Sequence, residues 1–417
     1  MSHTPIDIAH ENTPVAQTGE TQQPSRPAQV RAFRFVLLIG VMSFFADFTY
    51  EGARSVLGPF LALLGASATA IGFVTGLGEL AGYGLRLFSG RWADATGRLW
   101  FIAILGYVIQ MASVPALAFA NSWGMAATLI VLERVGKAIR NPPRDVMLSQ
   151  AGGKIGGYGW AFGVHEAMDQ FGAMVGPLIV AWVLAKQGSY QQAFAILALP
   201  AVLNICFVVI ARMTYPRPEE MEPPSASDET THLPQLYWIY LGGALLVAAG
   251  FADYPLLAYH FGKSDLLPGQ WIALFYAVAM AVSGTGSLVF GRLFDRFGFH
   301  VLTALTALSA LFAPLAFLGD FWSALIGTMI WGIALGVHES MIPAAVSPMV
   351  SVRRRATAFG IFTAAYGVFW FLGSALIGFL YDLDLAWAIT FCAGTQLLAV
   401  PIFMIVGRRY NRLRQSS

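Results

Sequence analysis

The chain has 417 residues, of which 57% are hydrophobic and only 12% are charged, and its mean hydropathy is +0.62. This charged fraction is about half that of a soluble globular domain and indicates an integral membrane protein. The formal net charge of +2 is too small to favour nucleic-acid binding, and the two cysteines, Cys206 and Cys392, both lie in apolar runs, which argues against a disulfide framework or a cysteine-based metal site.

Residues 1–32 are rich in Pro, Thr, Gln and Ser and predict a disordered cytoplasmic tail. Beyond them, apolar stretches of about twenty residues or more, the length that crosses a hydrocarbon core of about 30 Å, predict an all-α membrane protein with twelve transmembrane helices. We expect these spans at 33–64, 70–89, 99–120, 123–141, 159–185, 193–212, 235–261, 269–290, 300–319, 322–342, 357–380 and 385–407.

The positions of Lys and Arg predict the orientation of the spans. Four of the 25 basic residues lie within the spans and two, Lys186 and Lys263, lie in odd-numbered loops. The others lie in the tails, in the even-numbered loops or at the helix ends beside them. By the positive-inside rule both termini are therefore expected in the cytoplasm. The membrane that we expect is a bacterial inner membrane.

A short charged stretch at 90–98, Gly-Arg-Trp-Ala-Asp-Ala-Thr-Gly-Arg, is expected to form a turn between the second and third spans. Residues 291–298 repeat its Gly, Arg, Asp and Gly 201 positions later, between the eighth and ninth spans. The segments Phe45–Phe48 and Phe251–Tyr254 also match, as do 161–163 and 358–360. A repeat of this length indicates a duplicated helix bundle.

The paired charged stretches resemble the signature loop between helices 2 and 3 of the major facilitator superfamily of secondary transporters. The resemblance implies two pseudo-symmetric six-helix bundles, 33–212 and 235–407, joined by a cytoplasmic linker, 213–234, and followed by a tail, 408–417. It also implies alternating access to a cavity between the bundles, lined mainly by helices 1, 4, 7 and 10.

The first span carries Asp47, Glu51 and Arg54 at i, i+4 and i+7, on one face of a helix. An ionisable side chain at membrane depth is costly unless it is paired or faces water, so such residues mark ion or substrate pathways. We expect Asp47 to take part in proton coupling and Glu51 and Arg54 to contact substrate, with a packed Glu51–Arg54 pair as the alternative. The matching segment in the seventh span adds Asp253 and Tyr254 to the expected substrate site.

The fourth span ends in the densest charge cluster of the chain, 133–145, in which a stripe of charged residues runs from the membrane interior toward the cytoplasm. A proton-coupled carrier needs a carboxylate whose proton affinity a neighbouring cation sets. Glu133 beside Arg134 or Lys137 meets this need. We expect Glu133 to couple protons and the two cations to bind substrate.

The lower part of the same stripe, Arg140 and Arg144, is expected to contact lipid phosphate or to pair with Asp94 and Asp145 in a gate. The resemblance places further gate residues in the two charged stretches. The expected gate residues are Arg91, Asp94, Arg98, Arg140, Arg144, Asp145, Asp295 and Arg296.

The fifth span holds His165, Glu166 and Asp169 within about one helical turn. Because histidine–carboxylate chains act as proton relays in transporters, we expect Glu166 and Asp169 to couple protons and His165 to contact substrate. No second histidine stands at metal-binding spacing, so we expect no metal. The segment 172–177, Gly-Ala-Met-Val-Gly-Pro, resembles the glycine-proline motif of antiporters without its closing glycines, and close helix packing is the alternative explanation.

Other ionisable and aromatic residues in the spans support weaker predictions. Glu79 lies near the middle of the second span and is a proton site of lower rank, whereas a structural role is expected for Arg86. The notable polar residues of the second half are His260, His338 and Glu339. Aromatic side chains are more often packed than cavity-lining, so Tyr50, Tyr366 and Trp370 rank below the carboxylates.

Together these features predict a transporter of a small organic solute, most simply a proton-coupled exporter. The basic residues within the spans are compatible with an anionic or zwitterionic substrate. The alternatives are proton-symport uptake of a metabolite or a metal chelate, and a membrane sensor on the same scaffold. The sequence offers no nucleophile–base arrangement, so we expect no enzyme activity and no cofactor. The expected partners are the solute, protons and the lipid bilayer, with the chain acting as a monomer.

Overall fold

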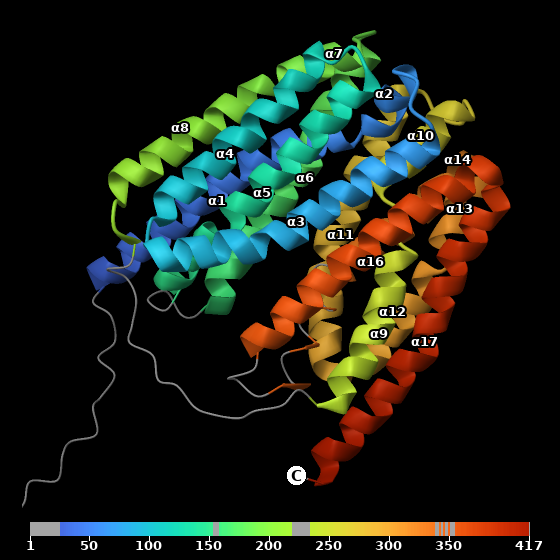
Figure 1. Ribbon diagram of the computed structural model, residues 1–417. Coiled ribbons are helices and arrows are strands. Elements are labelled where there is room, and N and C mark those ends of the chain that lie inside the picture. The colour runs from blue at the N-terminus through green and yellow to red at the C-terminus, as the bar shows by residue number, and fades with distance from the viewer. Residues whose placement is uncertain are drawn as a thin grey trace, which may run out of the picture.

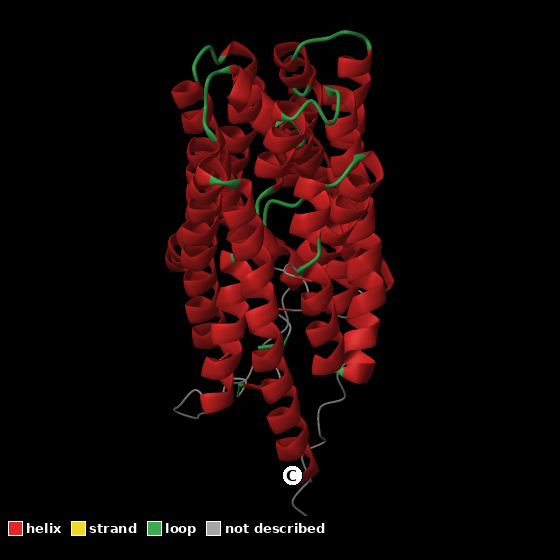
Figure 2. Ribbon diagram, turned by 90° about the vertical axis from the view of Figure 1, so that its right-hand side faces the viewer, coloured by secondary structure: helices red, strands yellow, loops and turns green. Residues whose placement is uncertain are grey.

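The computed structural model describes residues 26–152, 158–218, 234–337, 342, 345–346, 349–350 and 355–416. All regular secondary structure in these residues is helical, and none of them forms a strand (Figure 2). Most helices run lengthwise, so that the loops between them gather near the two ends of the molecule (Figure 1). The chain is therefore the all-α protein that its apolar runs predict.

Several of the expected spans are formed by two helical pieces in sequence. The first half of the chain contains α1 (Arg26–Arg54), α2 (Leu57–Leu63), α3 (Ala68–Thr96), α4 (Leu99–Ala116), the 3-10 turn η1 (Leu117–Phe119), α5 (Trp123–Gly152), α6 (Tyr158–Ala185), α7 (Tyr190–Ile196) and α8 (Ala198–Thr214). The second half contains α9 (Gln235–Ala249), α10 (Tyr254–Lys263), α11 (Gly269–Phe297), α12 (Phe299–Ser309), α13 (Phe312–Leu318), α14 (Phe321–Gly336), α16 (Arg355–Leu383) and α17 (Leu385–Ser416).

Nine helical segments of the described part are long and apolar enough to cross a membrane. The other three expected spans correspond to α3, α5 and α14. Of these, α3 and α5 carry ionisable residues within their apolar parts, and α14 is described over only 16 residues. The chain is thus a multi-pass membrane protein, and the full number of twelve spans stays a prediction.

The charged stretch 90–98 is mostly helical, which corrects the prediction of a nine-residue turn. Helix α3 continues to Thr96, and Gly97 ends it in the left-handed conformation, with φ of 63°. In the second copy α11 continues to Phe297 and ends at Gly298, with φ of 60°. A glycine adopts positive φ without the steric cost of a Cβ atom, so the last glycine of each copy alone makes the turn.

The ends of the chain are also more helical than the sequence indicates. Helix α1 begins at Arg26, before the expected end of the tail at residue 32, and α17 continues to Ser416, through the expected C-terminal tail. The start of α1 lies at the lower left of the bundle in Figure 1 and the end of α17 at the bottom, and we call this side of the molecule the terminus end. The short helices α2, α7 and α10 lie at the opposite end, which we call the distal end.

The two halves of the chain pack together most closely toward the distal end. A Cβ atom at Gly58 in α2 would lie 1.9 Å from the carbonyl oxygen of Pro255 in α10, and one at Gly72 in α3 would lie 2.2 Å from that of Ser374 in α16. Farther along α3, a Cβ atom at Gly82 would meet nothing within 4 Å. The glycines therefore allow backbone contact between the halves only in the distal part of this interface.

The carboxylate of Asp382 connects the two halves at the distal end. Asp382, near the end of α16, accepts hydrogen bonds from the backbone N–H groups of Ala68 (3.2 Å) and Thr69 (2.7 Å) and from the Thr69 hydroxyl (2.6 Å). The first N–H groups of a helix have no partner within the helix, and here the other half of the chain supplies one. Asp382 therefore links the halves at the N-terminus of α3.

Helix breaks place one polar residue between the halves. Helix α9 ends at Gly250, and α10 starts again at Tyr254, with Pro255 in its first turn, where a proline fits best. Asp253 precedes α10 in an extended conformation and makes no side-chain cap to its own helix. Its carboxylate is therefore available to partners from other helices.

Candidate functional site

Asp253 meets Arg54 of α1 at the interface between the halves. The Arg54 guanidinium lies 3.4 Å from Asp253, 3.5 Å from Glu79 of α3 and 3.8 Å from Glu51 of its own helix. Each of these residues is at most 8% exposed. Arg54 thus joins three carboxylates from both halves of the chain, and we call these four residues the Arg54 cluster.

The carboxylates of the Arg54 cluster have further donors. Asp253 accepts hydrogen bonds from the indole N–H of Trp370 (3.2 Å) and the hydroxyl of Ser374 (2.9 Å), both in α16. The hydroxyl of Tyr276 in α11 donates to Glu51 across the interface, at 2.5 Å. The predicted Glu51–Arg54 pair is therefore present, but it is one part of a larger network that joins the two halves.

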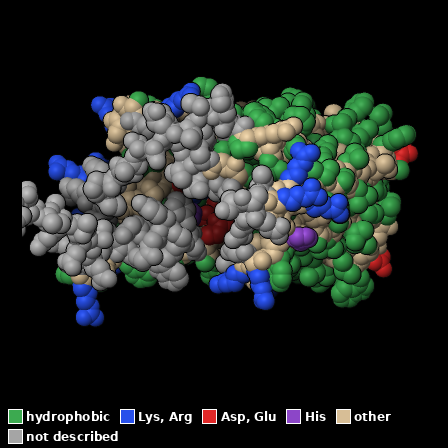
Figure 3. Space-filling model, turned by 90° about the horizontal axis from the view of Figure 1, so that it is seen from below, with side chains coloured by type: hydrophobic (Ala, Val, Ile, Leu, Met, Phe, Trp, Pro, Cys, Tyr) green, Lys and Arg blue, Asp and Glu red, His purple; other side chains and the backbone are tan. Residues whose placement is uncertain are grey.

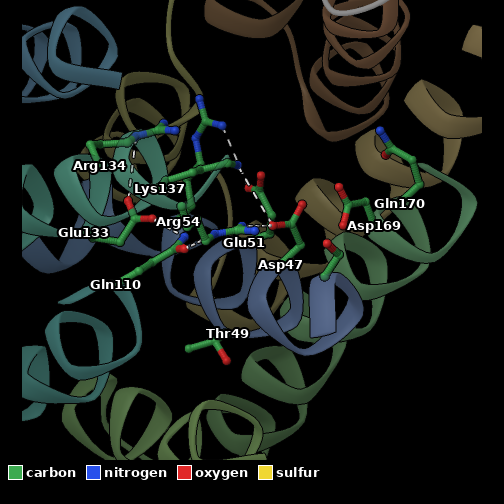
Figure 4. Close-up of polar contacts among 12 residues, drawn as sticks. Asp47, Thr49, Glu51, Arg54, Gln110, Glu133, Arg134, Lys137, Asp169 and Gln170 are labelled. Carbon is green, nitrogen blue, oxygen red and sulfur yellow. Dashed lines mark hydrogen bonds and ion pairs between the residues drawn. The ribbon is translucent and has the colours of Figure 1, made fainter. Parts of the chain in front are cut away.

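Asp47 lies about two turns earlier on the same face of α1 and faces cations of α5. Its carboxylate is 3.4 Å from the Arg140 guanidinium and 4.0 Å from the Lys137 amine. Figure 4 shows this face of α1 directed at α5, with Thr49 pointing the other way. The spacing argument for one charged face on α1 is confirmed.

Arg140 is fully buried beside Asp47, and its part in a gate stays a prediction, because the side chain of its predicted partner Asp94 lies outside the described residues. Arg140 donates to the side-chain oxygen of Gln110 in α4, at 2.5 Å, and the Gln110 amide donates to Glu133, at 2.7 Å. These bonds are possible because α4 and α5 approach closely: a Cβ atom at Gly106 in α4 would lie 2.5 Å from the backbone nitrogen of Arg140. Gln110 therefore orients an expected proton site and an expected gate residue together.

Arg134 pairs with two carboxylates, Glu79 and Glu133, and the second pair measures 3.8 Å. Glu133 thus has Arg134 as its cation, one of the two partners that the sequence suggests, whereas Lys137 turns to Asp47. Arg144 pairs with its neighbour Asp145 at 2.8 Å. This last contact is the one that the sequence predicts for Arg144.

The acidic residues of α6 differ from those of α1 and α5 because they have no Lys or Arg within 4 Å in the described part. Glu166 is exposed and accepts a hydrogen bond from Gln170, at 3.0 Å. Asp169 is 3.7 Å from the His165 ring, and its Oδ1 atom is buried without a hydrogen-bond partner. The other ring nitrogen of His165 lies 2.6 Å from the Ser43 hydroxyl.

His165, Glu166 and Asp169 also offer ligand atoms within 4.8 Å of one another. One imidazole nitrogen and two carboxylates are a donor set that divalent transition metals accept. Because the sequence lacks a second histidine at metal-binding spacing, the absence of a metal remains our expectation. These three residues would hold one if it were present.

The segment 172–177 serves close packing, the alternative that the sequence left open. Cβ atoms at Gly172 and Gly176 would each lie 2.2 Å from a carbonyl oxygen of α1, those of Phe44 and Phe48. These glycines let α6 lie directly against α1, so Asp169 comes to the face of α1 that carries Asp47 (Figure 4).

The expected gate residues of the charged stretches make few contacts. Arg91, Arg98 and Arg296 are exposed, and none of them forms an ion pair with another described side chain. The side chains of Asp94 and Asp295 lie outside the described residues, as do His338 and Glu339. At the terminus end, therefore, no described ion pair of these residues holds the halves together.

Tyr254 does not face an open site. It is fully buried, its ring lies at a tilt against those of Tyr276 and Trp331, and its hydroxyl donates to the Ile272 carbonyl at 2.5 Å. Two network residues, Gln110 and Tyr276, are absent from the predicted site, and Glu79 has only a low rank in it. A polar residue inside an apolar span is the signal that identifies Gln110 and Glu79, whereas a single tyrosine gives no such signal.

Known proteins with similar sequences point to one family. The sequence model of the Major Facilitator Superfamily matches residues 37–318 and 254–416. An uncharacterized protein of Mycobacterium tuberculosis is 39% identical over 390 residues, which cover 92% of this chain and 95% of that protein. An uncharacterized MFS-type transporter of Methanocaldococcus jannaschii is 27% identical over 89% of this chain and 94% of its own length.

The solved structures that resemble this chain show the same fold. The nucleoside transporter NupG superposes with a TM-score of 0.71 at 15% identity, over 89% of this chain and 98% of the NupG chain.

A shorter sequence match is to the fosmidomycin resistance protein of Escherichia coli, which is 29% identical over 34% of this chain and 34% of its own length. The match of the family model along almost the whole helical part, together with the duplicated halves and the polar network between them, shows that the chain belongs to the Major Facilitator Superfamily.

Proposed function

We propose that the chain exports a small organic solute by alternating access in exchange for protons. The observation that supports this proposal most strongly is the buried ionisable network between the halves. It contains five carboxylates from both halves, Asp47, Glu51, Glu79, Glu133 and Asp253. Burying a charged side chain in a membrane protein costs free energy, and charged residues within membrane spans usually serve the movement of ions or substrate.

In this proposal, 33–212 and 235–407 are the two bundles that rock against each other, and the terminus end faces the cytoplasm of a bacterial cell. Among the described residues, the basic side chains of the distal end are Lys186 and Lys263, as the positive-inside rule requires of the outer side. Figure 3 shows the terminus end, with Lys and Arg near its periphery and acidic side chains inside a hollow between the halves. The described conformation then corresponds to the inward-facing state.

The proton sites that we propose are Asp47, Glu133, Glu166 and Asp169, and their surroundings suggest different roles. Glu166 and Asp169 have no described Lys or Arg within 4 Å, so a proton can bind there without breaking an ion pair. Asp47 and Glu133 pair with Arg140 and Arg134, so protonation there would release a cation. We propose that α6 takes up the proton and that the α1–α5 pairs change partners in response.

Relatives support the direction of transport. Besides the fosmidomycin resistance protein, a multidrug resistance protein, MdtH, of Edwardsiella ictaluri is 28% identical over 38% of this chain and 39% of its own length. Resistance in both names is consistent with removal of a compound from the cell. The packing of 172–177 against α1 does not distinguish antiport from symport.

The proposal is tested in everted membrane vesicles that respiration has acidified, with a pH-sensitive dye inside. A panel of organic anions and cations is added to vesicles that carry the wild type or Asp169→Asn. Asp384→Asn is the matched control, because Asp384 is an exposed carboxylate that caps its own helix, through the N–H of Ala386 at 2.7 Å.

A compound that dissipates the gradient with the wild type and with Asp384→Asn, but not with Asp169→Asn, supports proton antiport through α6. If the panel leaves the gradient intact while one of its compounds still enters the vesicles through this protein, proton coupling is refuted. If whole cells accumulate the compound only when the protein is present, the direction is uptake by symport.

A further inference from the structure

Tyr50, on the charged face of α1, has a buried hydroxyl without a partner. The residue is 3% exposed, and its hydroxyl makes no hydrogen bond. A buried hydroxyl without a hydrogen-bond partner is unfavourable, because it has lost its water and gained nothing in exchange. The hydroxyl is therefore available to a ligand or to a water molecule.

Three cations surround the same ring. The Lys137 amine lies 4.5 Å from the ring centroid, the Arg134 guanidinium 4.6 Å and the Arg54 guanidinium 5.8 Å. The Arg54 and Arg134 guanidinium groups are committed to carboxylates through hydrogen bonds. Lys137 differs from them, because among the described residues its single ionic partner is Asp47 at 4.0 Å, beyond hydrogen-bond distance, and its side chain is 19% exposed.

Two donors around this ring, the Lys137 ammonium and the Tyr50 hydroxyl, therefore lack a hydrogen-bond partner among the described residues. Asp47, Glu51 and Glu133 each accept a hydrogen bond, from Arg140, Tyr276 and Gln110 respectively. The Lys137 ammonium keeps three N–H groups and Tyr50 one O–H group for another partner. An acceptor with negative charge would satisfy the lysine and the tyrosine together and would leave the existing carboxylate hydrogen bonds in place.

We infer that Lys137 and Tyr50 bind an oxyanion, a carboxylate or a phosphate-type group, of the transported solute. This inference rests on the proposed function in that it assigns the substrate class of the same site. The geometry suits one group, because the amine lies over the ring and an oxyanion can receive two charge-assisted hydrogen bonds of about 2.8 Å through different oxygens. Binding draws Lys137 away from Asp47 and leaves Asp47 with Arg140 alone.

The test measures binding and needs no proton gradient. Thermal unfolding of the purified protein in nanodiscs is followed in acetate, benzoate, inorganic phosphate and methylphosphonate, against chloride at equal ionic strength. The variants are Lys137→Ala and Tyr50→Phe, and the control is Lys186→Ala, which removes an exposed lysine in the loop after α6. Titration of the most protective oxyanion gives an apparent Kd for each protein.

We expect at least one oxyanion to raise the Tm of the wild type and of Lys186→Ala. Loss of one charge-assisted hydrogen bond weakens binding about tenfold or more, so Lys137→Ala should raise the apparent Kd by at least that factor. Tyr50→Phe should also weaken binding, while its Tm without ligand stays equal to or above that of the wild type, since it removes only an unpartnered hydroxyl. This combination separates a ligand contact from a structural role.

The inference is overturned if no oxyanion protects the wild type more than chloride does, which would mean that water alone occupies the site. It is also overturned if Lys137→Ala binds as tightly as Lys186→Ala. Protection by an oxyanion without proton movement in vesicles would refute the proposed antiport and leave this inference intact. Proton exchange with cations only, and no protection by oxyanions, would refute this inference and leave the proposed antiport intact.

Discussion

Replacing Asp382 by Ala should open the distal end of the molecule. The substitution removes the hydrogen bonds that the N-terminus of α3 donates to α16, one of them from the backbone N–H of Thr69 at 2.7 Å. Loss of a helix N-cap costs about 1 kcal/mol, and we take this typical value because the Asp382 carboxylate is exposed. Since the bonds connect the two halves, that free energy favours the state in which the distal end is closed. Removing it should raise the ratio of distally open to closed molecules about fivefold.

Electron-spin distance measurements between labels on the two halves report this ratio. Leu63, at the end of α2, and Leu318, at the end of α13, are both exposed at the distal end and suit substitution by labelled Cys in a background with Cys206→Ser. Asp320→Ala is the matched control, because Asp320 caps the N-terminus of α14 in its own half by accepting from Ser323 at 3.0 Å. A longer-distance population should grow in Asp382→Ala and not in Asp320→Ala. Equal distance distributions in the two variants would refute the reasoning.

Two further predictions concern the interface between the halves. Arg54→Ala leaves the three carboxylates of the Arg54 cluster facing one another without their shared cation. It should therefore lower the free energy of unfolding, measured by chemical denaturation in detergent, by about 3–5 kcal/mol. A loss no larger than that caused by replacing the exposed Arg91 would contradict this prediction. Gly72→Ala places a Cβ atom 2.2 Å from a carbonyl oxygen of α16 and should shift the distance between the same two labels toward longer values. Gly82→Ala should not, because a Cβ atom there meets no atom within 4 Å. Identical label distances in the two variants would show that the backbone contact does not hold the distal end closed.

Local sequence patterns predict the charged face of α1 well. The spacing of Asp47, Glu51 and Arg54 fixes their common direction because an α-helix repeats every 3.6 residues. The sequence also predicts that apolar runs form helices and that the halves are related, since both follow from residue type and position along one chain. Helix ends are less predictable, as α3 shows by continuing through the charged stretch to Thr96.

The partners of the charged residues depend on packing between helices that are distant in sequence. The sequence predicts Arg140 near the end of the fourth span but not its contacts with Asp47 and Gln110, which the close approach of α4 and α5 creates. Asp253 meets Arg54 only because α9 and α10 are separate helices, so that its side chain faces the other half. No spacing of residues along the sequence predicts either contact.

The measurement that tests the central claim most directly uses purified protein in liposomes with a pH gradient as the only energy source. The solute is an oxyanion found to bind the protein, supplied outside liposomes whose interior is acidic, and its accumulation is compared for the wild type, Asp47→Asn and Lys186→Ala. We expect the wild type and Lys186→Ala to accumulate the solute as protons leave, and Asp47→Asn to equilibrate it without accumulation. Equal uptake with and without the gradient, or accumulation by Asp47→Asn at the wild-type level, would contradict proton-coupled export through this network.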